Sequence, residues 1–396
     1  MNDVGLSCKH CASNDVEKNG RYFGQYGAYQ QYVCNTCGKK FSHKLEGPQE
    51  KRPEHPPVTL PPADDNSHPI SWPAYNQAQV QEKLRFLEIL SDLCSFIPEE
   101  NGGRVGRPRA SRREMAFCMV AKLYEGLSSR RVSSDLEIAM RRGAISRVPH
   151  FNTIIKYFND PVMSPILEAL IRVSALPLRD FETTFAVDAS GLSSAFYSRW
   201  FDVRLDAEKR NIHDWIKIHV ICGVKSNIVT AITVTDGLGA DSPRFPELVR
   251  KTAENFRVKE VLADKAYCGR DNMQTVADVG GVPYIPFRKG TTGRAEGRMA
   301  WNKMFHYFQL HREEFMKRYH QRSNVESTFS MLKRKFSSKL RMKNQVAQVN
   351  EALAMVLCHN ICVLVREACE AGISADFSDD AHLFPELHTK ARKLPI

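Results

Sequence analysis

The sequence has no long apolar run. Its longest strongly apolar stretch, Ala352 to Val365, contains His359 and Asn360 and is too short to span a bilayer. No apolar segment near the N-terminus indicates secretion, and no basic amphipathic helix indicates a membrane surface. We therefore expect a cytoplasmic protein without a membrane partner.

Acidic residues are in deficit. The 45 Asp and Glu residues are outnumbered by 56 Lys and Arg, and the net charge is +11. Such an excess of positive charge predicts a polyanionic partner, with nucleic acid ahead of membrane. The length of 396 residues predicts two or three domains with at least one substantial core.

The cysteines indicate a metal site. Eleven occur without a secretion signal, which favours metal binding over disulfides. Two CxxC pairs flank a pattern typical of a small β-ribbon, and four thiolates complete a tetrahedral Zn²⁺ shell. So short a module lacks a core, and we expect a structural Zn²⁺ to stabilise a zinc ribbon over residues 1–45. The predicted ligands are Cys8, Cys11, Cys34 and Cys37.

Residues 46–75 are rich in proline and predict an extended linker. Helical patterns follow over residues 76–176, interrupted by "NGGRVGRPRASRR". That segment fits either a basic arm that enters the minor groove through Arg107 and Arg109 or a loop with solvated charges.

Three short helical patterns between residues 113 and 160 fit a helix-turn-helix bundle. Its last helix would expose Asn152 and Lys156 to DNA. The alternative is a three-helix bundle that only packs. We interpret residues 76–176 as a helical, DNA-binding segment.

Strand patterns begin after Leu176, in "TTFAVDASG", "SRWFDVRL", "DWIKIHVICGV" and "NIVTAITVTDG". Helices then alternate with strands, and a helical part ends the domain, which predicts an α/β, ribonuclease-H-like domain over residues 177–370. Asp188 ends the first strand and Asp264 follows a later, buried one. Carboxylates at the ends of neighbouring strands repel one another unless they surround a divalent cation. Each aspartate alone also fits a simple turn or helix cap.

A third carboxylate lies in "YHQRSNVESTFSMLKRKF", residues 319–336. On a continuous helix, Tyr319, Arg322, Glu326 and Lys333 share one face. A solvated face with weak ion pairs is the alternative interpretation. Together with the two aspartates, Glu326 predicts a three-carboxylate cluster.

These motifs resemble the DDE transposases of prokaryotic insertion sequences, in the Tn5-related group. The resemblance rests on "VDASGL", "LADKAYCG" and the Y-x2-R-x3-E-x6-K row from Tyr319 to Lys333, and it covers about residues 113 to 366. The zinc ribbon and the proline-rich linker depart from the general pattern of that group.

The resemblance implies a catalytic triad of Asp188, Asp264 and Glu326 that holds two Mg²⁺ or Mn²⁺ ions. It implies cleavage of double-stranded DNA at the terminal inverted repeats of an element, followed by transfer of the end to target DNA. Arg322, Lys333 and Tyr319 would contact the DNA backbone. A homodimer is expected because two ends must meet. The alternatives are a non-catalytic DNA-binding regulator derived from a transposase and a nuclease of the same fold.

The tail, residues 371–396, carries no recognisable chemistry.

Overall fold

The computed structural model describes residues 6–24, 27–45, 71–98, 109–194, 215–375 and 377. The chain divides into two compact units, Met1–His68 and Pro69–Ile396, and each is described by itself. Several predictions fall outside the described residues: Arg107, the strand expected in "SRWFDVRL", most of the linker and most of the C-terminal tail.

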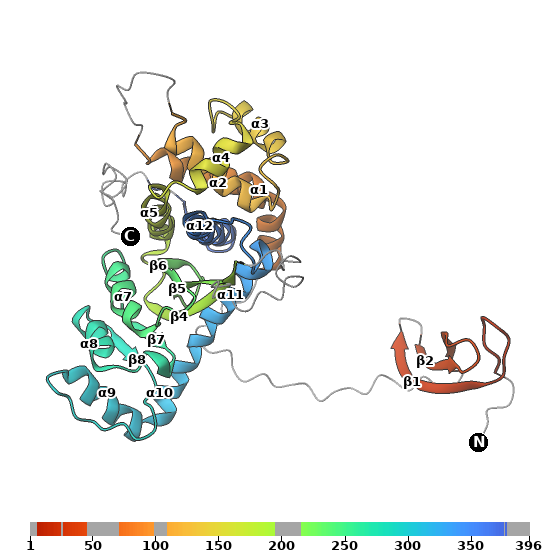
Figure 1. Ribbon diagram of the computed structural model, residues 1–396. Coiled ribbons are helices and arrows are strands. Elements are labelled where there is room, and N and C mark those ends of the chain that lie inside the picture. Colours follow the sequence, from red (N-terminus) through yellow and green to blue (C-terminus); the bar gives the residue numbers. More distant parts are fainter. Residues whose placement is uncertain are drawn as a thin grey trace, which may run out of the picture. The chain divides into compact units, whose positions relative to one another are not determined.

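The first unit is a small antiparallel sheet (Figure 1). Its strands are β1 (Val16–Gly24), β2 (Gly27–Cys34) and β3 (Lys40–Lys44), paired in the order β1-β2-β3. The described core contains two cysteines and two rings, Tyr32 and Phe41, whose centroids lie 5.7 Å apart. A core of this size cannot stabilise a domain alone, as the sequence predicts.

The second unit is built on a five-stranded mixed sheet with the order β6-β5-β4-β7-β8. Strands β4, β5 and β6 are antiparallel, and β7 and β8 run parallel to β4. Helices flank the sheet (Figure 1), and this arrangement fits the predicted ribonuclease-H-like fold. The strand bounds are β4 Thr184–Ser193, β5 Trp215–Gly223, β6 Val229–Asp236, β7 Glu260–Ala263 and β8 Val282–Tyr284.

Helices occupy the segments before, between and after the strands. The α-helices before the sheet are α1 Trp72–Ser95, α2 Arg112–Tyr124, α3 Ser133–Arg141, α4 Phe151–Phe158 and α5 Met163–Ala175. Those after β6 are α7 Phe245–Ala253, α8 Arg270–Asp278, α9 Met299–Leu310, α10 Arg312–Tyr319, α11 Ser323–Phe336 and α12 Gln345–Glu370. Short 3₁₀ turns are η1 Leu176–Leu178, η2 Ser242–Arg244, η3 Lys265–Tyr267 and η4 His320–Arg322.

Helix α1 begins earlier than the sequence analysis expects. Residues 72–75 are helical, although they fall inside the segment 46–75 interpreted as linker. The reason is local, because proline fits the first turn of a helix, where its missing N–H would have no partner anyway. Pro73 occupies that turn and therefore starts the helix instead of excluding it.

Helix α12 lies at the centre of the second unit. It packs against α1, α2 and α5 on one side and contacts β5 and β6 on the other (Figure 1). Its fully buried Asn360 accepts a hydrogen bond from the Val229 N–H (2.9 Å) and donates to the carbonyls of Val229 and Ile171. The helices before the sheet and the sheet itself thus share one hydrophobic core.

The apolar character of α12 comes from this central position. The helix has 26 residues, more than the short apolar stretch expected from the sequence. By length and composition alone it could cross a membrane, but 78% of its most apolar window is buried inside the protein. Burial of this extent is typical of the core helix of a globular domain.

Candidate DNA-cleavage site

Two aspartates meet where the parallel strands β4 and β7 stop pairing. The prediction that Asp188 ends its strand is wrong: Asp188 lies in the middle of β4 (Thr184–Ser193) and is paired with Val220, because β4 continues along β5 past the end of β7. Val187 of β4 is in register with Ala263 of β7, so the residues that follow them, Asp188 and Asp264, lie side by side. The Ala189 N–H donates to Asp188 Oδ1 at 2.8 Å, and the Ala266 N–H donates to Asp264 Oδ1 at 2.7 Å. Backbone donors therefore fix one oxygen of each carboxylate.

The environment of Asp188 disfavours its negative charge. Burial raises the pKa of this carboxyl above its usual value, and the nearby Asp264 adds to the effect. The Ala189 N–H and Arg322 act in the opposite direction. A partly buried carboxylate beside another acid requires a nearby positive charge to remain ionised at neutral pH.

Arg322 supplies a positive charge. Its Nη1 donates to Asp188 Oδ2 at 3.0 Å, and its Nη2 donates to Glu326 Oε1. Turn η4, which carries Arg322, contacts both β4 and β7. The guanidinium thus joins Asp188 on β4 to the carboxylate on α11.

The prediction of a continuous α-helix over residues 319–336 is wrong. Helix α10 ends at Tyr319, η4 forms one 3₁₀ turn, and α11 begins at Ser323. A 3₁₀ turn advances more per residue than an α-helix and turns side chains away from the spacing of an ideal α-helix. Arg322 still faces Glu326 across four residues, whereas Tyr319 is half-buried and packs against the hydrophobic core.

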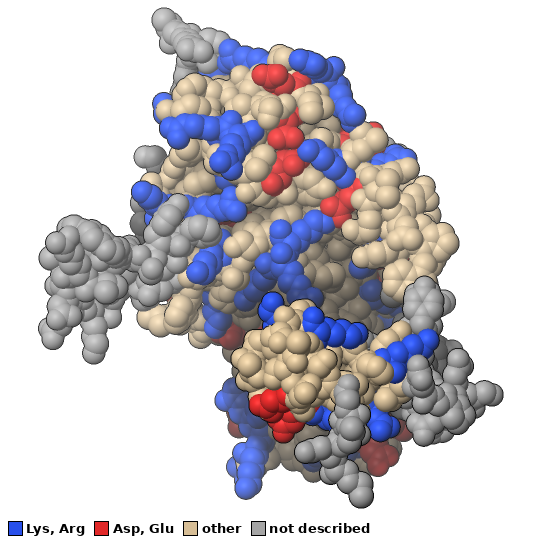
Figure 2. Space-filling model, turned by 90° about the vertical axis from the view of Figure 1, so that its right-hand side faces the viewer, with Lys and Arg blue, Asp and Glu red and all other residues tan. Residues whose placement is uncertain are grey.

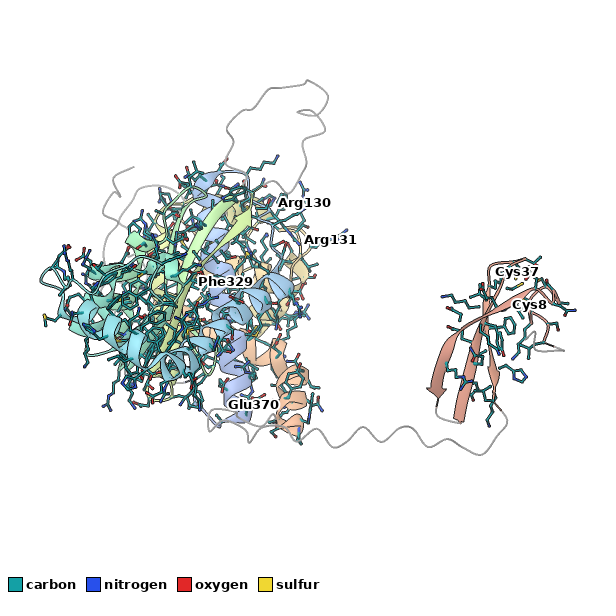
Figure 3. All side chains as sticks on the ribbon, turned by 90° about the horizontal axis from the view of Figure 1, so that it is seen from below. Cys8, Cys37, Arg130, Arg131, Phe329 and Glu370 are labelled. Atoms are coloured by element: carbon teal, nitrogen blue, oxygen red, sulfur yellow. The ribbon has the colours of Figure 1, made fainter. Side chains whose placement is uncertain are left out.

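Helix α11 is held on the sheet by an apolar stripe and by polar contacts, among them the hydrogen bond from Thr328 Oγ1 to Cys222 Sγ on β5 at 3.4 Å. The buried Val325, Phe329 and Leu332 anchor it, and Phe329 lies in the interior of the unit (Figure 3). Lys333 Nζ donates to Ser190 Oγ on β4 at 2.7 Å. Because side chains alternate along a strand, Ser190 lies on the same face as Asp188, so the Lys333 ammonium lies on the site's side of β4. Burial lowers the pKa of Lys333.

The three carboxylates do not form a closed metal cluster here. Within the described residues, the single group of three or more Cys, His, Asp or Glu side chains whose ligand atoms lie within 4.8 Å of one another is a cysteine cluster. Arg322 instead holds Asp188 and Glu326 by separate hydrogen bonds. The carboxylate oxygens are nonetheless the hard donors that Mg²⁺ and Mn²⁺ prefer. The oxygens of the three carboxylates therefore fit such ions once Arg322 no longer hydrogen-bonds Asp188 and Glu326.

A second polar group lies on the neighbouring strand. Lys217 Nζ forms an ion pair with Asp241 Oδ1 at 2.5 Å. The fully buried His219 hydrogen-bonds Thr235 Oγ1 through Nε2 at 2.9 Å, and burial lowers its pKa. The sequence patterns did not single out His219 as a site residue. The signal that could have identified it is a histidine within an otherwise apolar strand.

The cysteine cluster lies in the first unit. The Cys8 and Cys37 sulfurs are 3.7 Å apart, and those of Cys11 and Cys34 are 3.5 Å apart. All four lie within 4.8 Å of one another. A tetrahedral site with metal–sulfur bonds of about 2.3 Å requires sulfurs about 3.8 Å apart. The geometry therefore fits one tetrahedral, four-thiolate metal site.

The second knuckle, Cys34–Cys37, is shaped by backbone geometry. The Gly38 N–H donates to the Cys34 carbonyl at 2.8 Å, and Gly38 has a φ of 69°, which glycine adopts without strain. Burial acts to raise the pKa of Cys34, but N–H groups of the knuckle lower it to about 6. A thiol with a lowered pKa is a ready metal ligand. In Figure 3, Cys8 and Cys37 lie together at one end of the small sheet.

The predicted helix-turn-helix residues form an exposed basic surface. Asn152 and Lys156 are exposed on α4, and Arg109 is exposed ahead of α2. Arg130 and Arg131 point outward from the second unit (Figure 3), and the Arg130 guanidinium lies 4.5 Å from the Phe151 ring centroid. Lys and Arg also outnumber acids over the face that carries α1, α3 and α11 (Figure 2). The sequence patterns did not single out Arg130 and Arg131, although both belong to the basic segment "SSRR", residues 128–131.

The fold is an α/β domain in which two aspartates lie side by side on adjacent parallel strands of a mixed sheet and a glutamate comes from a helix packed beside them. Residues 179–361 match the family model described as a transposase DDE domain. The match spans the whole sheet and includes Asp188, Asp264 and Glu326, and it supports a DDE transposase. No curated protein and no solved structure matches the chain.

Proposed function

We propose that the protein is a DNA transposase that cleaves the ends of its element and joins them to target DNA. One observation carries the proposal. Asp188 and Asp264 lie side by side on adjacent strands, and Arg322 hydrogen-bonds both Asp188 and Glu326. The match to the transposase DDE domain over the same residues supports it.

The carboxylates Asp188, Asp264 and Glu326 would hold two Mg²⁺ or Mn²⁺ ions. When bound, these ions activate the attacking oxygen and stabilise the leaving oxygen of a phosphodiester. The chain itself contributes placement, because backbone N–H groups orient both aspartates. Arg322, once released from the carboxylates, presents its planar fork to a phosphate. Lys333 holds a second phosphate from the same face, and Tyr319 adds a backbone contact.

The remaining basic elements would recognise the element's ends. In this proposal α4 presents Asn152 and Lys156 to DNA, and the arm with Arg107 and Arg109 enters the minor groove. The zinc ribbon, stabilised by one structural Zn²⁺, binds a further stretch. Two copies of the chain hold the two inverted repeats, and the protein acts on DNA in the cytoplasm of a prokaryotic cell.

The test uses purified protein, labelled duplexes that carry the inverted repeats flanking its gene, and a supercoiled target plasmid. We expect joined products with Mg²⁺, none with EDTA, and none from the Asp264→Asn variant. Cleavage without joining would favour a nuclease of the same fold. Binding without cleavage in Mg²⁺ would favour a non-catalytic regulator and contradict the proposal.

A further inference from the structure

A second cationic surface lies beside Asp264, away from Arg322 and Lys333. We name it the 288–294 surface and define it by Arg288, Lys289, Arg294 and the neighbouring Lys265, all exposed. Within the described residues, none of these four side chains has an acidic partner. The surface follows β8, which is the neighbour of β7 on the side away from β4. It therefore lies beyond Asp264 as seen from Asp188.

Arg288 fastens this surface to the turn that carries the aspartate. Its Nε donates to the Lys265 carbonyl at 3.1 Å, and its Nη2 donates to the Ala266 carbonyl at 3.0 Å. The Ala266 N–H in turn donates to Asp264 Oδ1. One short chain of hydrogen bonds thus links the cationic loop to a carboxylate of the proposed site.

The loop is braced before any ligand binds. Trp301 Nε1 donates to the Thr292 carbonyl at 2.9 Å, and Asn302 Nδ2 donates to the Gly293 carbonyl at 2.8 Å. Arg270 Nε donates to the Arg294 carbonyl at 3.0 Å. Hydrogen bonds that pre-order a loop reduce the entropy lost when it binds a partner.

Two acids near the loop already have cationic partners. Arg270 pairs with Glu296 at 3.1 Å, and Arg298 pairs with Asp271 at 2.8 Å. Arg288 is engaged with two backbone carbonyls, whereas the Lys265, Lys289 and Arg294 side chains remain available for a polyanion. The segment "RKGTTGR" offers Lys and Arg charges, Thr hydroxyls and glycine backbone. Such groups contact phosphates and carry little sequence information.

We propose that the 288–294 surface binds the target DNA duplex during strand transfer. This rests on the proposed function, in which one site must hold an element end and a second duplex. In the proposed function, Arg322 and Lys333 hold the element end. The 288–294 surface lies on the other side of Asp264 from these two residues. Lys, Arg and Thr side chains can all contact phosphates, which are the same in every duplex, and this fits a duplex whose sequence is not fixed.

The experiment compares wild type with the double variant Lys289→Glu/Arg294→Glu. The matched control is Arg257→Glu/Lys259→Glu, two exposed cations just before β7, at the other end of that strand. A pre-cleaved element end is joined to a supercoiled plasmid, and cleavage of an intact end is followed in parallel. Binding of an unrelated duplex is measured over a range of salt concentrations. Thermal melting verifies that each variant is folded.

We expect the ratio of joined product to cleaved end to fall about tenfold in the double variant and to stay near wild type in the control. The slope of log binding constant against log salt for the unrelated duplex should become shallower by about 2, because two phosphate contacts are lost. An unchanged ratio, or an equal loss in the control, would overturn the inference. A parallel loss of cleavage and joining would also overturn it, since the surface would then hold the element end.

The two proposals fail separately. If wild type neither cleaves nor joins, the proposed function fails, and the salt dependence of duplex binding still tests the surface. An unchanged salt slope in the folded double variant rejects the surface as a DNA contact.

Discussion

Arg322 lies between Asp188 and Glu326 and donates one hydrogen bond to each. The guanidinium comes from η4, the aspartate from β4 and the glutamate from α11. The positive charge of Arg322 therefore lies between two carboxylates that are proposed metal ligands. This arrangement implies that metal entry and release of Arg322 are coupled.

Replacing Arg322 tests this coupling. Without metal, Arg322→Ala should lower the free energy of unfolding by about 1–2 kcal/mol, because Asp188 loses its charged donor. Mn²⁺ should then stabilise the variant more than it stabilises wild type, since no guanidinium competes. Thermal melts with EDTA and with increasing Mn²⁺ measure both effects.

Arg322→Lys is the matched variant, because it keeps the charge without the fork that reaches two carboxylates. We expect an intermediate metal response. Equal stabilisation of wild type and Arg322→Ala by Mn²⁺ would show that the guanidinium does not compete with metal.

Lys333 offers a separate test of the DNA-contacting face. Lys333→Ala should weaken binding of the element end and make the salt slope shallower by about 1, as expected for one lost phosphate contact. Ser190→Ala removes the hydrogen-bond partner of Lys333 but keeps the cation. Gel-shift titrations at several salt concentrations should show the wild-type slope for Ser190→Ala. An unchanged slope in Lys333→Ala would count against the phosphate contact.

The cysteine cluster predicts one tightly bound zinc per chain. Cys34→Ser should remove the metal and unfold the first unit, because its described core is too small to fold without it. Metal analysis and amide exchange over residues 6–45 measure the loss. Cys369→Ser, outside the cluster, is the control and should retain one zinc. Retention of zinc by Cys34→Ser would contradict the four-thiolate site.

His359 predicts acid sensitivity of the core. Its Nε2 hydrogen-bonds the Asn227 carbonyl at 2.9 Å, and burial lowers its pKa from 6.5 to about 4. Because the folded pKa lies below the unfolded one, this stabilisation is present above pH 6.5 and is lost as the pH falls toward 4. Between pH 7 and pH 4, wild type should lose about 3 kcal/mol more than His359→Gln. Urea unfolding across this range tests the difference, and parallel curves for the two proteins would contradict it.

Much of the fold follows from local sequence patterns. Alternating or continuous apolar runs bounded by turns located the described strands, and "LADKAY" placed Asp264 directly after its strand. Asp188 in "AVDASG" lies inside β4 instead of at its end, because pairing with β5 extends that strand to Ser193. Parallel pairing of β4 with β7 then brings them together without any further information. The CxxC spacing likewise predicted the cysteine cluster.

Other features depend on tertiary contacts and could not be predicted from the sequence. The 3₁₀ turn at η4 interrupts a pattern that is helical on both sides, and no residue in it is a helix breaker. The Arg322 contact to Asp188 joins residues 134 positions apart. The Lys217 ion pair with Asp241 depends on how the loop after β6 folds back, which periodicity does not report.

The most direct test of the account is cleavage of an element end by Glu326→Gln in Mg²⁺. This variant keeps the shape of the side chain and removes the charge of the third proposed metal ligand. We predict a loss of cleavage of at least about a thousandfold, with binding of the end within a few-fold of wild type. Cleavage within about tenfold of wild type would contradict the three-carboxylate site.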